Sequence, residues 1–264
     1  MIKDITLGQY FPGESILHKA DSRVKIILTF AFSLVTFVIS SYVGFLALAV
    51  FTMIGIKISK VPIRYTLKGL KPLVFVIAFS TLMNLLTTEG TAFFEYKFIK
   101  LTYEGMDTAI KLTLRLSLLI MITSLMTLTT TPISLTDGLE KLMNPLKKVG
   151  APIHEFAMMM TIALRFIPTL LEETDKIMKA QASRGADFES GNIIQRAKSF
   201  IPVLVPLFVS AFRRADELAM AMEARCYRGG KGRTRMKQLR FKSLDFILLS
   251  VSIGVAVLLV FVLR

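Results

Sequence analysis

The chain has 264 residues, of which 53% are hydrophobic and 20% charged, and its formal net charge is +14. Its apolar residues fall in blocks of about 17 to 21, close to the ~20 residues with which a helix crosses the hydrocarbon core of a bilayer. We therefore expect a polytopic membrane protein whose surplus of Lys and Arg reflects cytoplasmic segments, and not a nucleic-acid-binding protein. The single cysteine excludes an internal disulfide and a cysteine metal cluster.

The first half of the chain predicts four membrane spans joined by short connections. A polar arm of residues 1–23 comes first, and it lacks the apolar core and cleavage site of a removable signal peptide. Lys19, Arg23 and Lys25 flank the first span and predict a cytoplasmic N-terminus, and five cations without an acid mark residues 57–71 as a cytoplasmic loop. The expected spans are residues 24–41, 43–58, 72–87 and 106–130.

Residues 88–105 differ from the spans on either side because apolar and polar side chains alternate along them. A period of two favours extended structure, so we predict a small hairpin near residues 90–104. Its two cations against three acids are consistent with the outer face of the membrane.

Arg115 is the deepest charge in any predicted span. A charge near the middle of a bilayer costs about 2.5–3.5 kcal/mol on insertion scales, so such an arginine usually faces a partner or the protein interior. The alternative is that Arg115 extends to the outer headgroups or pairs with Asp107 on the same helix.

Residues 132–242 hold 19 Lys and Arg against 11 Asp and Glu, a surplus that predicts a cytoplasmic location. A short amphipathic helix is expected to end at Gly150, followed by two long helices at residues 152–184 and 193–228. Prolines within both long helices should bend them. A final span at residues 244–263 would leave the C-terminus outside.

The predicted fold class is all-α, with about five transmembrane helices and a cytoplasmic domain of three helices, two of them long and crossing. The expected domains are residues 1–131 in the membrane, 132–240 in the cytoplasm, and 241–264 as a C-terminal transmembrane helix. We expect the protein in the cell membrane, with its N-terminus cytoplasmic and its C-terminus extracellular.

We find no residues for a catalytic, cofactor-binding or metal site. Gly229, Gly230, Lys231 and Gly232 have the glycines of a phosphate-binding loop but neither its spacing nor its final hydroxyl. Cys226 has no nearby histidine to activate it. The chain is therefore not expected to be an enzyme.

The most informative feature is an arginine near the end of each long helix, set between small residues. Such an arginine is sterically open, so its planar fork can enter a groove on a partner and donate to carboxylates or helix-end carbonyls. Two such ends suit two similar partners or the halves of a dimer, although a solvated helix end would have the same sequence. The two triplets are Ser183, Arg184, Gly185 and Ala224, Arg225, Cys226.

Methionines also gather on the two long helices. They indicate either ordinary packing between the helices or an adaptable apolar surface for docking a membrane partner. The residues concerned are Met158, Met159, Met160, Met220 and Met222.

Over nearly its whole length the chain resembles the transmembrane T component of energy-coupling factor (ECF) transporters, which are vitamin importers related to ABC systems. The resemblance rests on GQYFPGESILHKADSRVK, LRFIPTLLEETDKIMKAQASRGAD and PVLVPLFVSAFRRADELAMAMEARCYRGG. The family's signature is a pair of Ala-Arg-Gly triplets at the ends of its coupling helices. This chain departs from each triplet at one position, with Ser183 in the first and Cys226 in the second.

This resemblance implies that residues 132–240 are a coupling domain whose arginine ends contact two ABC-type ATPase subunits. ATP-driven movement would pass through this domain to a separate substrate-binding membrane subunit, the S component, for uptake of a vitamin or micronutrient. The chain itself would need no cofactor, because the partner subunits bind ATP, and its other partner would be membrane lipid, without nucleic acid. The alternatives are a stand-alone secondary transporter or channel, or the T subunit of a dedicated cobalt, nickel or biotin system.

Overall fold

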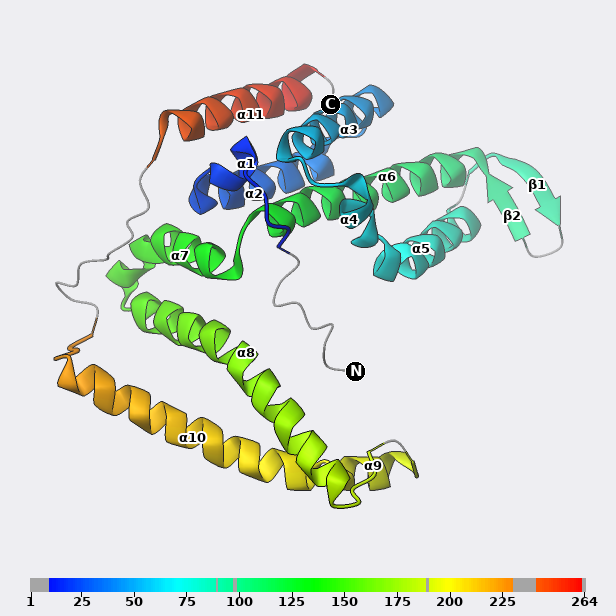
Figure 1. Cartoon of the computed structure of the whole chain (residues 1–264). Helices are drawn as coiled ribbons and strands as arrows, with labels where there is room; N and C mark the ends of the chain where they lie inside the picture. The colour runs from blue at the N-terminus through cyan, green and yellow to red at the C-terminus, as the bar shows by residue number, and fades with distance from the viewer. Residues whose placement is uncertain (1–9, 89, 97–98, 189, 230–240, 263–264) are drawn as a thin grey trace. The chain divides into compact units, whose positions relative to one another are not determined.

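The computed structural model describes residues 10–88, 90–96, 99–188, 190–229 and 241–262 (Figure 1). The chain divides into two compact units. We call residues 8–142 and 239–264 the membrane unit, and residues 1–7 and 143–238 the long-helix unit. The short helix after Pro132, which the sequence analysis grouped with the cytoplasmic residues, packs as part of the membrane unit.

The membrane unit is built mainly from helices. In chain order these are α1 (Ile16–Lys19), α2 (Ser22–Val38), α3 (Tyr42–Ser59), α4 (Ile63–Lys68), the 3-10 turn η1 (Lys71–Leu73), α5 (Val74–Thr87), α6 (Tyr103–Thr129), α7 (Pro132–Met143) and α11 (Ser243–Val262).

Between α5 and α6 lies a two-stranded antiparallel hairpin, at the place where the alternating pattern predicts one. It consists of β1 (Ala92–Tyr96) and β2 (Ile99–Thr102), with Tyr96 opposite Ile99 and Glu95 opposite Lys100. The turn residues 97–98 lie outside the described residues.

Six segments of the described residues are long and apolar enough to cross a membrane. They are Tyr42–Ser59, Ile63–Leu85, Tyr103–Thr129, Ile153–Ser183, Ile194–Ala224 and Ser243–Phe261. Four of them overlap predicted spans, and Ile63–Leu85 begins nine residues before the span predicted at residues 72–87. The first predicted span forms α2, which has 17 residues and is about 25 Å long. The multi-pass membrane protein is thereby confirmed. The cytoplasmic location of the two long helices, which meet the same criteria of length and composition, stays a prediction.

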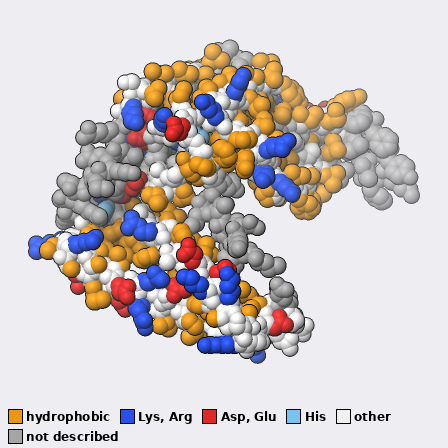
Figure 2. All heavy atoms as spheres, in the orientation of Figure 1, with side chains coloured by type: hydrophobic (Ala, Val, Ile, Leu, Met, Phe, Trp, Pro, Cys, Tyr) orange, Lys and Arg blue, Asp and Glu red, His pale blue; other side chains and the backbone are white. Residues whose placement is uncertain are grey.

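The helices of the membrane unit meet around an apolar cluster contributed by α2, α3, α6 and α11. Phe32 stacks on Phe51 at 4.8 Å between ring centroids, and Ile39, Leu48 and Leu259 are almost fully buried beside them. Many large apolar side chains face outward instead, and hydrophobic atoms cover much of the visible surface (Figure 2). Lipid can accept such a surface, whereas water would not.

Polar contacts set the relative directions of the helices. The start of α2 contacts the start of α11, because the backbone N–H of Asp21 donates to Oδ1 of Asp245 at 2.8 Å. The start of α2 also contacts the end of α6, where Lys25 Nζ donates to the carbonyl of Thr129 at 2.8 Å. Helices α2 and α11 therefore cross in one direction and α6 in the other, as the predicted order of spans requires. Which side is cytoplasmic stays a prediction.

The long-helix unit contains the 3-10 turn η2 (Asn144–Val149), α8 (Ile153–Ser183), α9 (Ile193–Ser199) and α10 (Ile201–Ala224). The second long helix was predicted as continuous over residues 193–228, and this is wrong in detail. It breaks at Phe200, which caps both α9 and α10. The ring of Pro202, in the first turn of α10, fills a position where an N–H would otherwise continue the hydrogen-bond ladder.

Helices α8 and α10 pack against each other in antiparallel directions. The end of α8 lies at the start of α10, where Gln181 Nε2 donates to the carbonyl of Pro202 at 3.4 Å. From this point α10 runs back along α8 (Figure 1). The two arginine ends are therefore at opposite ends of the helix pair.

Candidate functional site

Helix α8 ends in a double hydrogen-bonded turn that includes the first triplet. The N–H of Ala186 donates to the carbonyl of Gln181, and that of Gly185 to the carbonyl of Ala182, both at 3.0 Å. This is the Schellman pattern, which satisfies carbonyls that a helix end would otherwise leave without partners. Gly185 takes the left-handed conformation that the pattern needs, with φ of 88°.

Helix α10 ends in the same pattern, formed by the second triplet. The N–H of Tyr227 donates to the carbonyl of Met222 at 3.0 Å, and that of Cys226 to the carbonyl of Glu223 at 2.8 Å. Here the left-handed position is occupied by Cys226, with φ of 57°. A side chain in this conformation costs about 1–2 kcal/mol, so the fold maintains at Cys226 a geometry that glycine would adopt without strain.

The two arginines occupy equivalent backbone positions. Arg184 has φ −92° and ψ 8°, and Arg225 has φ −92° and ψ 14°. Both side chains are exposed, and among the described residues neither guanidinium group forms a hydrogen bond or ion pair. Each long helix therefore presents one unpaired guanidinium group on a fixed backbone turn.

A polar contact that the sequence analysis missed joins α8 to α10 between the two ends. Glu173 accepts a hydrogen bond from Ser210 Oγ at 2.5 Å and forms an ion pair with Arg214 Nη2 at 3.1 Å. The Glu173 side chain is only 24% exposed, so its charge is partly shielded from water. We call these three residues the clasp, because they join α8 to α10 in the middle of the helix pair, away from both arginine ends.

The predicted methionine surface does not form one face. Met158 and Met222 are half-buried, whereas Met159, Met160 and Met220 are exposed. Successive helical positions are about 100° apart, so neighbouring methionines point in different directions.

A clearer apolar surface lies on α10. Ile201, Val205, Phe208 and Phe212 recur at helical spacing, and each is more than half exposed. The spacing of these four residues is readable in the sequence, but their exposure depends on which face of α10 packs on α8.

In the membrane unit, the structure decides between the two interpretations of Arg115. Its Nε donates to the carbonyl of Thr36 and its Nη2 to the carbonyl of Ile39, both at 3.2 Å. Asp107 instead pairs with Lys111 at 2.7 Å. Arg115 thus faces the protein interior, where it binds carbonyls at the C-terminal end of α2 that also carry the negative end of the helix dipole.

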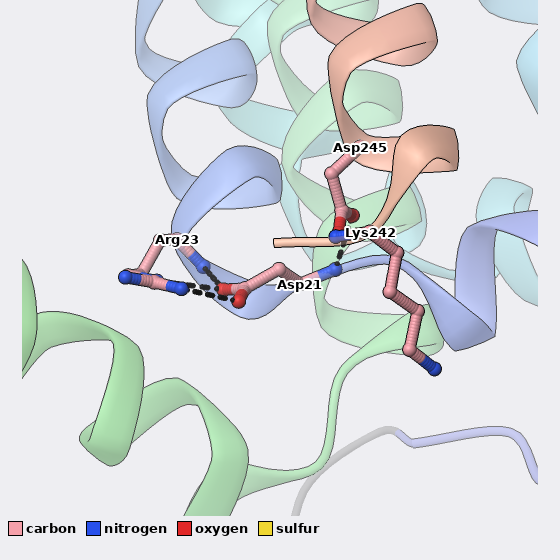
Figure 3. A network of polar contacts seen from close by, with 4 residues as sticks. All are labelled: Asp21, Arg23, Lys242 and Asp245. Atoms are coloured by element: carbon pink, nitrogen blue, oxygen red, sulfur yellow. Dashed lines mark hydrogen bonds and ion pairs between the residues drawn. The ribbon is translucent and has the colours of Figure 1, made fainter. Parts of the chain in front are cut away.

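The start of α2 is tied to the start of α11 by two buried carboxylates, those of Asp21 and Asp245, and their partners (Figure 3). Asp245, with 2% of its surface exposed, accepts the N–H groups of Asp21 and Lys242 at 2.8 and 2.7 Å. Arg23 binds both carboxylate oxygens of Asp21 and lies 4.0 Å from the ring centroid of Phe241. Burial alone would raise the pKa of the Asp21 carboxyl, but hydrogen bonds and charge from Arg23 outweigh it and hold this pKa below its ordinary value.

The Asp245 contact and the clasp differ in how far the sequence alone could have revealed them. Asp245 is the only acid in the predicted last span and lies in its first turn, which is a readable signal for a helix-start contact. Glu173 and Arg214 are 41 positions apart and carry no local pattern, so only the packing of α8 on α10 reveals the clasp.

Comparison with known proteins gives consistent matches. The CbiQ family model, described as cobalt transport protein, matches residues 13–236. A protein of Ruminiclostridium cellulolyticum named energy-coupling factor transporter transmembrane protein EcfT is 60% identical over 96% of this chain and 95% of its own length. Proteins of the same name from Clostridium kluyveri and Bacillus subtilis are 57% and 48% identical, over 94% and 99% of this chain and 92% and 99% of their own lengths.

Proposed function

The chain belongs to the family of transmembrane T components of ECF transporters, and from this premise we propose that it couples two ATPase subunits to a substrate-binding membrane subunit. Arg184 would contact one ATPase and Arg225 the other, on the cytoplasmic side. The ATPases bind and hydrolyse ATP, and this chain carries no catalytic step. The S component binds the vitamin or micronutrient to be imported.

One observation carries this proposal: two guanidinium groups, with no partner among the residues that the structure describes, stand on two helix-ending turns of the same hydrogen-bond pattern. A hydrogen bond to a charged group contributes about 1.5–3 kcal/mol, so each arginine can add substantially to the binding of a carboxylate-bearing partner. The fixed turn lowers the entropy lost on binding, because the backbone at Arg184 and Arg225 is already ordered.

The clasp supports a role in transmitting movement. Glu173 ties α8 to α10 through Ser210 and Arg214, so a force applied at either arginine end acts on the pair and not on one helix. The exposed apolar stripe of α10 from Ile201 to Phe212 offers a surface on which the S component could respond to that movement. The exposed methionines Met159, Met160 and Met220 add adaptable apolar area.

The proposal is tested by co-purification of the tagged chain with both ATPases. Arg184→Ala and Arg225→Ala should each reduce ATPase recovery by about tenfold or more, and the double variant should abolish it, since each change removes a charge-assisted contact. Arg213→Ala is the matched control, because Arg213 is exposed on α10 but lies away from its end. Full recovery of both ATPases by the double variant would refute the proposal.

A second candidate function is the T subunit of a dedicated cobalt importer, because the matched family model is described as cobalt transport protein. The names of the curated relatives favour the energy-coupling factor transporter instead. The two are separated by identifying the membrane subunits that co-purify and by comparing uptake of labelled vitamins with uptake of Co²⁺ in proteoliposomes. Uptake of Co²⁺ alone would favour the dedicated importer.

A further inference from the structure

A cleft of about 620 Å³ lies beside the Arg225 end, between the start of α8 and the end of α10. Its volume is in the range of sites that hold a small ligand or a few side chains of a partner. The lining comes from both helices and includes the end triplet itself, since Arg225 and Cys226 are among its residues. The cleft is thus part of the same surface as the second arginine end.

The lining separates into an apolar floor and a cationic rim. Half-buried side chains form the floor, and they are Met158, Ile162, Leu218 and Met222. Exposed arginines form the rim, and they are Arg165, Arg225 and Arg228. Among the described residues that line the cleft, none is Asp or Glu.

The rim arginines have no neutralising partner in the part of the chain that the structure describes. Among the described residues, the guanidinium groups of Arg165, Arg225 and Arg228 form no hydrogen bond or ion pair. The clasp offers a contrast on the same two helices, since Arg214 there has its carboxylate partner at 3.1 Å. Three unpaired cations around an apolar floor favour an occupant with an apolar side chain flanked by carboxylates.

We propose that this cleft is a second contact for the ATPase subunit that takes the Arg225 end, and that it receives an apolar side chain of that subunit with carboxylates on either side. This inference rests on the proposed function, in which Arg225 contacts an ATPase. The occupant is assigned by position: Arg225 and Cys226 both form the helix end and line the cleft, so a protein that reaches Arg225 lies across the cleft mouth.

The chain supplies its own reporter for this contact. Cys226 is the only cysteine in the sequence, it is exposed, and it lines the cleft. Bound ATPase should therefore protect its thiol from a maleimide. Cys226→Ser combined with Ser183→Cys moves the single cysteine to the Arg184 end and provides the matched control.

The experiment uses the full-length chain in detergent with purified cysteine-free ATPase subunits, and it measures binding and the rate of maleimide labelling. Arg165→Glu should weaken the contact at the Arg225 end by about tenfold or more and restore labelling of Cys226. Labelling of the control cysteine at position 183 should be unchanged by Arg165→Glu. Arg165→Ala should give the same changes to a smaller extent, and its gel-filtration profile confirms folding.

The outcomes separate this inference from the function on which it rests. If Arg225→Ala reduces binding but both Arg165 variants leave binding and protection as in the wild type, the cleft contact is wrong and the proposed function stands. If neither Arg225→Ala nor the Arg165 variants change binding, both are wrong. If vesicles of phosphatidylglycerol protect Cys226 without ATPase and vesicles of phosphatidylcholine do not, the cleft holds an anionic lipid and the inference is overturned.

Discussion

Two pairs of arginines, one pair in each unit, differ in whether the described residues supply their partners. In the membrane unit, Arg115 binds two carbonyls at the end of α2, and Arg23 binds both oxygens of Asp21. In the long-helix unit, Arg184 and Arg225 stand on ordered helix ends without any partner among the described residues. Arginine is thus structural at positions 23 and 115 and available for binding at positions 184 and 225.

This difference follows from the cost of an unpaired charge. An arginine shielded from water and without a partner is strongly unfavourable, and the partly buried Arg23 and Arg115 are met by a carboxylate and by carbonyls. An exposed arginine loses little stability by remaining unpaired, so its donor groups stay available for binding. Substitutions of paired residues should therefore reduce stability, whereas Arg184→Ala and Arg225→Ala should leave stability almost unchanged.

The largest loss of stability is expected for Asp245→Ala. It removes the acceptor of two N–H groups, that of the buried Asp21 and that of Lys242. A buried donor without a partner costs about 1–3 kcal/mol, so the variant should lose about 2–4 kcal/mol of unfolding free energy, measured by denaturant titration in detergent. Asp245→Asn keeps one oxygen acceptor and should lose less. Wild-type stability in the alanine variant would show that this contact is not structural.

Arg115→Met should have the next largest effect, about 1–3 kcal/mol, because the carbonyls of Thr36 and Ile39 lose their charged donor. Arg115→Lys retains the charge but replaces a planar fork by a single donor group. The stability of this variant should therefore lie between that of the wild type and that of Arg115→Met. Thermal unfolding of the three proteins in the same detergent gives the order. An order in which lysine is worse than methionine would contradict this assignment.

Glu173→Ala tests the clasp, which lies in the long-helix unit but is paired like the arginines of the membrane unit. It leaves Arg214 and Ser210 without their partner and should cost about 1–2 kcal/mol. Asp175→Ala is the control, because its ion pair with Lys179 is long, at 3.5 Å, and exposed, and should contribute less than about 0.5 kcal/mol. Equal unfolding temperatures for the two variants would count against the clasp.

The smallest effects should have opposite signs at the two equivalent helix-end positions. Gly185→Ala forces a side chain into a left-handed conformation and should destabilise by about 1 kcal/mol, whereas Cys226→Gly relieves the same strain and should stabilise by up to about 1 kcal/mol. Apart from its two chain neighbours, no described residue has a heavy atom within 4 Å of a Cβ added at Gly185, so the effect comes from the backbone and not from a clash. Amide hydrogen exchange at residues 181–187 and 222–227 measures the local stability of the two helix ends. Changes of the same sign would contradict the equivalence.

The sequence predicted the features that depend on short-range patterns. The apolar blocks predicted most spans, and the small residues around Arg184 and Arg225 predicted open helix ends. The break at Phe200 was missed because a proline near a helix start is compatible with both a bend and a new helix. The clasp, the exposed stripe of α10 and the cleft beside Arg225 depend on the packing of α8 on α10, which no local pattern encodes.

Substrate uptake by a reconstituted complex that contains Arg184→Ala and Arg225→Ala together tests the central claim most directly. Because neither arginine has a structural partner among the described residues, the double variant should unfold at the wild-type temperature in detergent. ATP-driven uptake into proteoliposomes should fall to background. Uptake at the wild-type rate by the double variant would contradict the assignment of these two helix ends to ATPase coupling.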